Sequence, residues 1–113
     1  MRSVYFDNIQ KGIALGVYDE LERCTGFQWD DGNSGKNWER HKVTDGEAEE
    51  IFFNDPLVAG ADVRHSDKEV RFYALGRTDS DRHLFVAFTV RGRQIRVISA
   101  RDMTAKEIRK YMA

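Results

Sequence analysis

Three consecutive segments near the end of the chain constrain its fold more than any other feature. They read EVRFYALGR, HLFVAFTVR and QIRVISAR, and each is rich in β-branched and aromatic residues. The short sequences TDSD and RG separate them, which is typical of the turns in two adjacent hairpins. The sequence therefore predicts three neighbouring antiparallel strands over residues 69–101.

Apolar and polar residues alternate in the first two of these segments. The residues that share the apolar face are Val70, Phe72 and Ala74 in the first segment and Leu84, Val86, Phe88 and Val90 in the second. The opposite face carries charged residues, among them Arg71, Arg77 and Arg91. This pattern predicts a sheet with one buried and one charged face. The third segment alternates less cleanly, so we expect it to be covered on both sides.

Short helices and strands precede and follow this unit. Thr44 with Glu47, and Thr104 with Glu107, have the spacing of a capping box, so helices are expected to begin at both places. Residues 36–41 are expected to form a short helix. Residues 27–29 and 57–61 are expected to form short strands. These elements predict a single α+β domain over residues 1–113.

The first residues of the chain predict a further helix. Ile9, Ile13, Val17 and Leu21 are four apart, which places them on one stripe of a helix over residues 8–24. The predicted architecture is therefore a small antiparallel sheet, with helices packed on one face and an extra N-terminal helix.

Charge is distributed unevenly along the chain, although its net charge is only −1. Residues 1–62 hold 6 basic and 13 acidic side chains, whereas residues 63–113 hold 12 basic and 6 acidic ones. The basic half contains several arginines, whose planar donors match phosphate oxygens. If these side chains converge on one patch, the patch would bind a polyanion. The alternative is that folding intermixes the two halves and the arginines are ordinary surface residues.

Several other functions lack support in the sequence. His41, His65 and His83 have no metal-ligand spacing, and no phosphate-binding glycine motif occurs, so we expect no metal and no cofactor. Cys24 is the only cysteine, so no disulfide can form within the chain. No apolar run approaches the roughly 20 residues of a membrane span. A cytoplasmic protein that does not interact with membranes is the simplest interpretation.

Metal-free RNA cleavage requires only a base for the 2′-OH proton, a cation for the phosphorane and an acid for the leaving 5′ oxygen. His41 is a candidate for proton transfer, because imidazole titrates near neutral pH. Glu69 could serve as base or hold an arginine. A histidine at the end of a helix is more often structural, so both interpretations of His41 stay open.

Sequence motifs across residues 27–112 resemble the BrnT family. The pattern includes Phe-x-Trp-Asp at residues 27–30, Glu-x-Arg-Phe at 69–72, Gly-Arg at 76–77, Thr-x-Arg-Gly at 89–92 and Ile-Ser-Ala-Arg at 98–101. The resemblance implies a RelE-like fold and a ribonuclease toxin of a type II toxin–antitoxin pair. It also implies a BrnA-like antitoxin, DNA binding only through the antitoxin complex, and a dimer or heterotetramer in that complex.

The resemblance also suggests where the site lies. The residues expected to carry catalysis are Arg71, Arg77, Arg101, Glu69 and His41. Those expected to bind RNA are Arg91, Arg96, Arg109 and Lys110. Arg71, Arg77 and Arg101 are assigned to phosphate and transition-state charge, and His41 or Glu69 to proton transfer.

Two departures from the family pattern leave other functions open. Family members often have Lys-His-Gly-Val, whereas this chain has Arg40-His41-Lys42-Val43. Residues 1–26 form an extension before the toxin core at residues 27–113. The alternatives are a non-catalytic module that binds nucleic acid or protein, and a toxin made inert by its extension.

Overall fold

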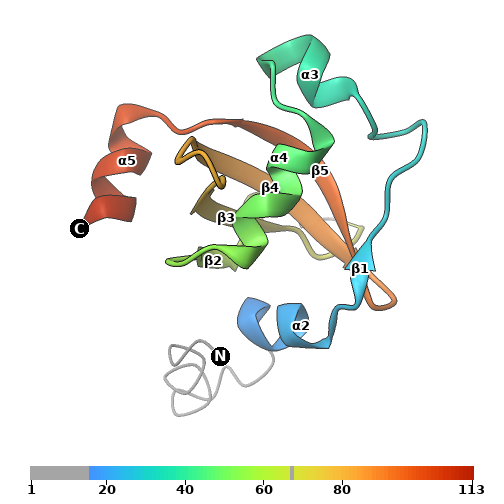
Figure 1. The fold of residues 1–113 in the computed structure, drawn as a ribbon. Coiled ribbons are helices and arrows are strands. Elements are labelled where there is room, and N and C mark those ends of the chain that lie inside the picture. Colours follow the sequence, from blue (N-terminus) through green and yellow to red (C-terminus); the bar gives the residue numbers. More distant parts are fainter. Residues whose placement is uncertain (1–15, 67) are drawn as a thin grey trace.

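A mixed sheet forms the centre of the computed structural model, which describes residues 16–66 and 68–113 (Figure 1). Its order is β1-β5-β4-β3-β2. The strands are β1 (Gly26–Phe27), β2 (Val58–Ala61), β3 (Phe72–Arg77), β4 (His83–Arg91) and β5 (Gln94–Asp102). The predicted antiparallel hairpins β3–β4 and β4–β5 are confirmed, and β2 adds an antiparallel edge. Strand β1 differs from the predicted antiparallel arrangement, because it pairs in parallel with β5.

The helices confirm the α+β class. They are α2 (Val17–Arg23), α3 (Lys36–His41), α4 (Asp45–Glu50) and α5 (Ala105–Met112), with 3-10 turns η1 (Ile51–Phe53) and η2 (Val63–His65). Both predicted capping boxes are present, at the starts of α4 and α5. Helix α2 is the end of the predicted helix over residues 8–24, and the start of that prediction lies outside the described residues. Among the described helices, none has the length and apolar character needed to cross a membrane.

One face of the sheet, which we call the buried face, forms the main core. It carries Phe72, Ala74, Leu84, Val86, Phe88, Val97 and Ala100, and α4 and η1 contribute Ala48, Ile51 and Phe52. Gly76 allows the close approach of η1, because a Cβ at this position would lie 2.8 Å from the Ile51 Cβ. The apolar alternation therefore identified the buried face correctly in β3 and β4, but it was wrong for Val70, which precedes β3 and is 57% exposed.

The opposite face, which we call the outer face, is covered at one end by α5. Tyr111 of α5 packs with Leu75 and with Met103, and Phe85 lies against the same cluster. The Tyr111 hydroxyl donates to the Pro56 carbonyl at 2.6 Å. Helices therefore lie on both faces of the sheet, because the apolar Leu75 side chain points outward and needs cover.

A bulge explains why the alternation in β5 is irregular. Ser99 pairs with Ala87 but Val97 pairs with Phe88, so Ile98 has no partner residue on β4. The bulge keeps both Arg96 and Arg101 on the outer face, although their positions differ in parity.

Two buried asparagines cover the other edge of β5. Asn33 Nδ2 donates to the Val97 carbonyl at 3.0 Å, and Asn37 Oδ1 accepts from the Ala100 N–H at 2.9 Å.

Candidate nucleic-acid interface and active site

Strand register places most of the predicted basic residues on the outer face, in two groups. Arg101 pairs with Phe85, whereas Arg96 pairs with Thr89 beside the start of β3. Phe85 and Thr89 are four positions apart on β4. The two groups are therefore separated by roughly 13 Å, at about 3.3 Å per residue. We call residues 62–66 and 68–71, with Arg91 and Arg96, the Arg71 end. We call Arg77, Phe85, Arg101 and α5 the Arg101 end.

Two arginines at the Arg71 end form ion pairs with two bonds each. Arg91 donates to the Glu69 carboxylate at 3.0 and 3.0 Å. Arg96 donates to the Asp30 carboxylate at 2.9 and 3.0 Å, and only 12% of its side chain is exposed. The hydrogen bond from Arg91 lowers the pKa of Glu69, and the one from Arg96 lowers the pKa of Asp30. Both carboxylates are therefore ionised at neutral pH, and both guanidinium groups are occupied.

The guanidinium of Arg71 is different. Within residues 16–66 and 68–113, no side chain forms a hydrogen bond or ion pair with it. Its charge also helps to lower the pKa of Glu69, after the larger effect of the Arg91 hydrogen bond. Arg71 lines a pocket of about 370 Å³ together with His65, Lys68 and Glu69. The Arg71 end thus combines a guanidinium that no described side chain occupies with three other groups that can exchange protons or bind anions.

Backbone contacts of Arg71 fix the loop that carries this pocket. The Asp62 N–H donates to the Arg71 carbonyl at 2.8 Å, which extends the β2–β3 ladder. The Ser66 hydroxyl donates to the Asp62 carbonyl at 2.6 Å and accepts from the Arg71 N–H at 3.0 Å. Within the loop, the Asp62 carboxylate contacts His65 Nδ1 at 3.0 and 3.2 Å. His65 and Arg71 are therefore held by the same residues.

At the Arg101 end, the cations lie against aromatic rings. Arg101 lies over the Phe85 ring, 4.2 Å from its centroid, and donates to the Glu107 carboxylate at 2.8 and 3.0 Å. The hydrogen bond from Arg101 lowers the pKa of Glu107. The Phe85 and Tyr73 rings are parallel within 3°, and Lys110 lies over Tyr73 and donates to its hydroxyl at 3.3 Å. Tyr73 and Phe85 are thus part of a basic aromatic surface.

The remaining predicted side chains of the Arg101 end lie at its edge. Arg77 donates to the Asp55 carbonyl at 2.8 Å and lies 3.7 Å from the Asp81 carboxylate. Arg109 is exposed on α5. Register therefore brings Arg77, Arg101 and α5 to one end of the face, apart from Glu69 and Arg71.

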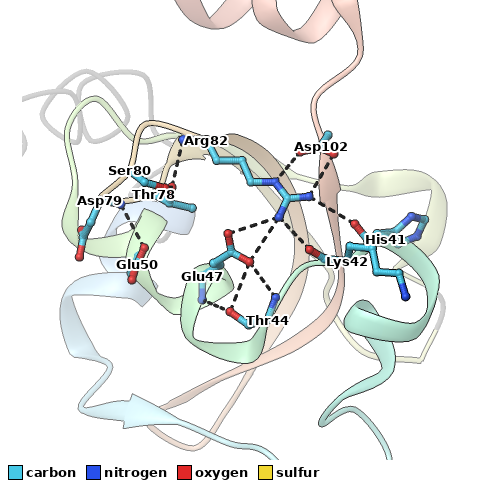
Figure 2. Close-up of polar contacts among 10 residues, drawn as sticks. All are labelled: His41, Lys42, Thr44, Glu47, Glu50, Thr78, Asp79, Ser80, Arg82 and Asp102. Atoms are coloured by element: carbon cyan, nitrogen blue, oxygen red, sulfur yellow. Dashed lines mark hydrogen bonds and ion pairs between the residues drawn. The ribbon is translucent and has the colours of Figure 1, made fainter.

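His41 lies elsewhere, beside a cluster centred on Arg82 (Figure 2). Arg82 donates to the Asp102 carboxylate at 2.7 and 3.1 Å and to both Glu47 carboxylate oxygens at 3.3 Å. It also donates to the Lys42 carbonyl at 2.8 Å and the His41 carbonyl at 3.3 Å. Asp102 pairs with Leu84 and points to the buried face. The structure therefore does not bring His41 together with Glu69 or Arg71.

The Arg82 cluster has a structural role. It joins the C-terminal end of α3, the capping box of α4 and the last residue of β5. The hydrogen bond from Arg82 lowers the pKa of Asp102. Burial opposes ionisation of Glu47, but hydrogen bonds from the Thr44 N–H and from Arg82 outweigh it and lower the pKa. These contacts stabilise the turn that ends α3.

Sequence reasoning missed several residues of this surface. His65 was considered only as a metal ligand, and Lys68, Tyr73 and Phe85 were not considered as site residues. The spacing of Asp62 and His65 in a polar loop before a strand could have identified the pair. In the described parts of the chain, no group of three or more His, Cys, Asp or Glu side chains could hold a metal ion.

Comparison with known proteins adds one match. A family model described as "Ribonuclease toxin, BrnT, of type II toxin-antitoxin system" matches residues 29–107, which is more than half of the chain. The matched segment contains both carboxylate–arginine pairs and the pocket of the Arg71 end. A search of curated proteins found no match.

Proposed function

Because this chain belongs to the BrnT family of ribonuclease toxins of type II toxin–antitoxin systems, we propose that it is a metal-independent endoribonuclease. In this proposal it acts in the cytoplasm and cleaves RNA without a cofactor. Cleavage inhibits translation and growth, and a cognate BrnA-like antitoxin neutralises the toxin. Residues 27–113 form the toxin core, and residues 1–26 are an extension of the same domain.

The observation that carries this proposal is the Arg71 guanidinium, which has no side-chain partner among the described residues and lies beside the ionised Glu69 carboxylate. RNA cleavage by the 2′ oxygen passes through a phosphorane that carries more negative charge than the substrate. A fixed guanidinium stabilises that charge where it develops. Asp62 and Ser66 hold the backbone of Arg71 in place, so its side chain starts from a fixed position beside the pocket.

The other predicted residues receive supporting roles. Arg71 contacts the reacting phosphate, and Arg77 and Arg101 contact phosphates farther along the strand. Four further basic residues contribute to RNA binding through the positive electrostatic potential of the outer face: Arg91, Arg96, Arg109 and Lys110. The resemblance implies Glu69 or His41 for proton transfer, and of these two Glu69 lies beside Arg71. Arg91 and Arg96 bind RNA while they hold Glu69 and Asp30 in place.

Expression in bacteria and cleavage by the purified protein test this proposal. Wild-type protein should arrest growth and cleave RNA at the same rate with and without EDTA. Arg71→Ala should restore growth while its circular dichroism spectrum and melting temperature stay those of wild type. RNA binding that weakens with salt but produces no cleavage would instead favour a non-catalytic binding module on the same fold.

The antitoxin part of the proposal has its own test. A reading frame next to the gene should encode a small DNA-binding protein that copurifies with this chain and restores growth. The complex, as a dimer or heterotetramer, should bind its promoter DNA, whereas the toxin alone should not. Growth arrest that continues when the neighbouring protein is coexpressed would contradict the assignment of that protein as antitoxin.

A further inference from the structure

We propose that His65, oriented by Asp62, is a proton-transfer residue for RNA cleavage at the Arg71 end. This inference rests on the proposed ribonuclease function and names a residue that the function alone does not supply. Neither the sequence motifs nor the family match assigns a role to His65. The contacts, the pocket and the anchoring of the loop support the assignment independently.

The first support is the contact between the imidazole and a carboxylate. His65 Nδ1 lies 3.0 and 3.2 Å from the two oxygens of Asp62. In the neutral imidazole this contact places the proton on Nδ1, which leaves the lone pair on Nε2. The His65 side chain is 63% exposed, so a substrate can reach Nε2. The carboxylate also stabilises the imidazolium that forms when Nε2 accepts a proton.

The second support is the composition of the pocket. Its lining consists of His65, Lys68, Glu69 and Arg71. Among the described residues, Lys68 and Arg71 of the pocket are basic and Glu69 is acidic, and the acidic Asp62 lies against the imidazole. A base, a phosphate-binding guanidinium and a second cation thus line one pocket. This set supplies the base and the cations that transesterification without a metal requires, and water supplies the acid.

The third support is that one set of hydrogen bonds positions both reacting groups. Asp62 donates its N–H to the Arg71 carbonyl, and Ser66 links the Asp62 carbonyl to the Arg71 N–H. The side chain of Asp62 then orients His65. Because both residues are attached to the same frame, the backbones that carry them are held together before RNA binds. This lowers the entropy cost of bringing the base and the guanidinium to one phosphate.

The reaction can be written with all atoms accounted for. Nε2 of His65 takes the proton of the 2′-OH, and the 2′ oxygen forms a bond to phosphorus. The bond from phosphorus to the 5′ oxygen breaks, and the 5′ oxygen takes a proton from water. The products are a 2′,3′-cyclic phosphate and a 5′-hydroxyl. The imidazolium then gives its proton to the hydroxide left by that water, which restores the neutral base. Arg71 stabilises the phosphorane charge.

His65 is a better base than the two groups suggested by the resemblance. Glu69 is held by two bonds from Arg91, which lower its pKa and make it a weak base. His41 lies beside Asp102, on the side of the buried face and at the other end of β4. Glu69 then serves mainly to hold Arg91, and it contributes charge beside the pocket.

Removal of the imidazole and its chemical replacement test this assignment. His65→Ala should lower the single-turnover cleavage rate about 10²- to 10⁴-fold. Its affinity for a 2′-O-methyl oligonucleotide, which cannot be cleaved, should change less than about threefold, because the phosphate contacts remain. Free imidazole should restore part of the rate to His65→Ala and should not accelerate wild type. The matched control is His83→Ala at the start of β4, outside both ends, which should cleave RNA at nearly the wild-type rate.

Asp62→Asn tests the orienting carboxylate while it keeps the backbone bonds of the loop. It should lower the cleavage rate by roughly tenfold or more, because the imidazolium loses its partner. Its affinity for the 2′-O-methyl oligonucleotide should stay within about threefold of wild type, because the phosphate contacts remain. A variant that loses rate and oligonucleotide affinity together would show that Asp62 shapes the loop and does not orient the base.

The outcomes separate this inference from the proposed function. If wild type cleaves RNA and His65→Ala cleaves equally well, the inference is wrong and the ribonuclease proposal stands. Loss of activity that imidazole does not restore, accompanied by lost oligonucleotide affinity, would also overturn the proton-transfer role. Failure of the folded wild type to cleave any RNA would overturn both.

Discussion

The two ends of the outer face use the same kinds of residue for different purposes. At the Arg101 end, the guanidinium pairs with Glu107, whose carboxylate also caps α5 at the Thr104 N–H. At the Arg71 end, Arg91 and Arg96 occupy the carboxylates, and the guanidinium of Arg71 faces a pocket without such a partner among the described residues. The comparison shows that the partners of an arginine, rather than its position on the face, determine whether its guanidinium stabilises the fold or can bind a substrate phosphate.

The largest expected effect comes from the Arg71 end. Arg71→Ala should lower the RNA cleavage rate about 10²- to 10³-fold, because a fixed group that stabilises the phosphorane is lost. The free energy of unfolding should change by no more than about 0.5 kcal/mol, since no described side chain depends on the guanidinium. Single-turnover kinetics and urea denaturation measure the two effects. A large loss of stability in Arg71→Ala would show that Arg71 stabilises the fold as Arg101 does, and it would contradict the proposed difference between the two ends.

Arg101→Ala should show the opposite pattern. The free energy of unfolding should fall by about 1–3 kcal/mol, because Glu107 loses both bonds and Phe85 loses its cation contact. The cleavage rate at saturating protein should fall much less than in Arg71→Ala. Urea denaturation with Arg109→Ala as control measures the stability loss, because Arg109 is exposed on the same helix. If Arg101→Ala is as stable as wild type, the Arg101–Glu107 pair is not structural.

Acid pH should weaken the ion pair between Arg101 and Glu107, which stabilises the Arg101 end. Arg101 lowers the pKa of Glu107 below its ordinary value of 4.5, so the pair contributes stability above that value and loses it as pH falls further. The difference in unfolding free energy between wild type and Arg101→Ala should therefore shrink between about pH 7 and about pH 3. A difference that stays constant over this range would mean that the carboxylate does not carry the effect.

A position outside both ends gives the smallest expected effect. Lys42 ends α3 with φ of 56°, the left-handed region that favours glycine. Glycine adopts this conformation without a Cβ penalty, whereas the loss of the Lys42–Trp38 contact offsets part of the gain. Lys42→Gly should therefore raise the free energy of unfolding by roughly 0.5 kcal/mol. The cleavage rate should not change. A destabilised variant would show that the lysine contact outweighs the backbone effect.

Much of the fold could be predicted from local signals. The alternation in β3 and β4 and the capping boxes at Thr44 and Thr104 depend on residues close in sequence, so the elements appeared nearly where expected. The bulge at Ile98 could not be predicted, because it depends on pairing between strands. The parallel pairing of β1 depends on a chain reversal over many residues, which periodicity does not encode.

The candidate site could be predicted only in part. Parity within β3 and β4 placed Arg71, Arg77 and Arg91 on one face, and the register agrees. Ion-pair partners are a tertiary property, so the sequence did not indicate that Asp30 holds Arg96, a residue distant in the chain. His41 was favoured over His65 because it lies in a recognisable motif. The pocket around His65 depends on a loop held by backbone bonds to Arg71.

A matched pair of arginine-to-lysine variants tests the central claim that the Arg71 end carries the chemistry. Lysine keeps the charge but loses the planar fork of donors that fits a phosphate. Single-turnover cleavage should be measured for Arg71→Lys and Arg101→Lys at saturating protein. The account predicts that Arg71→Lys is slower than wild type by more than about tenfold, whereas Arg101→Lys stays within about threefold. The reverse order, with Arg101→Lys the slower enzyme, would place the chemistry at the other end and contradict the account.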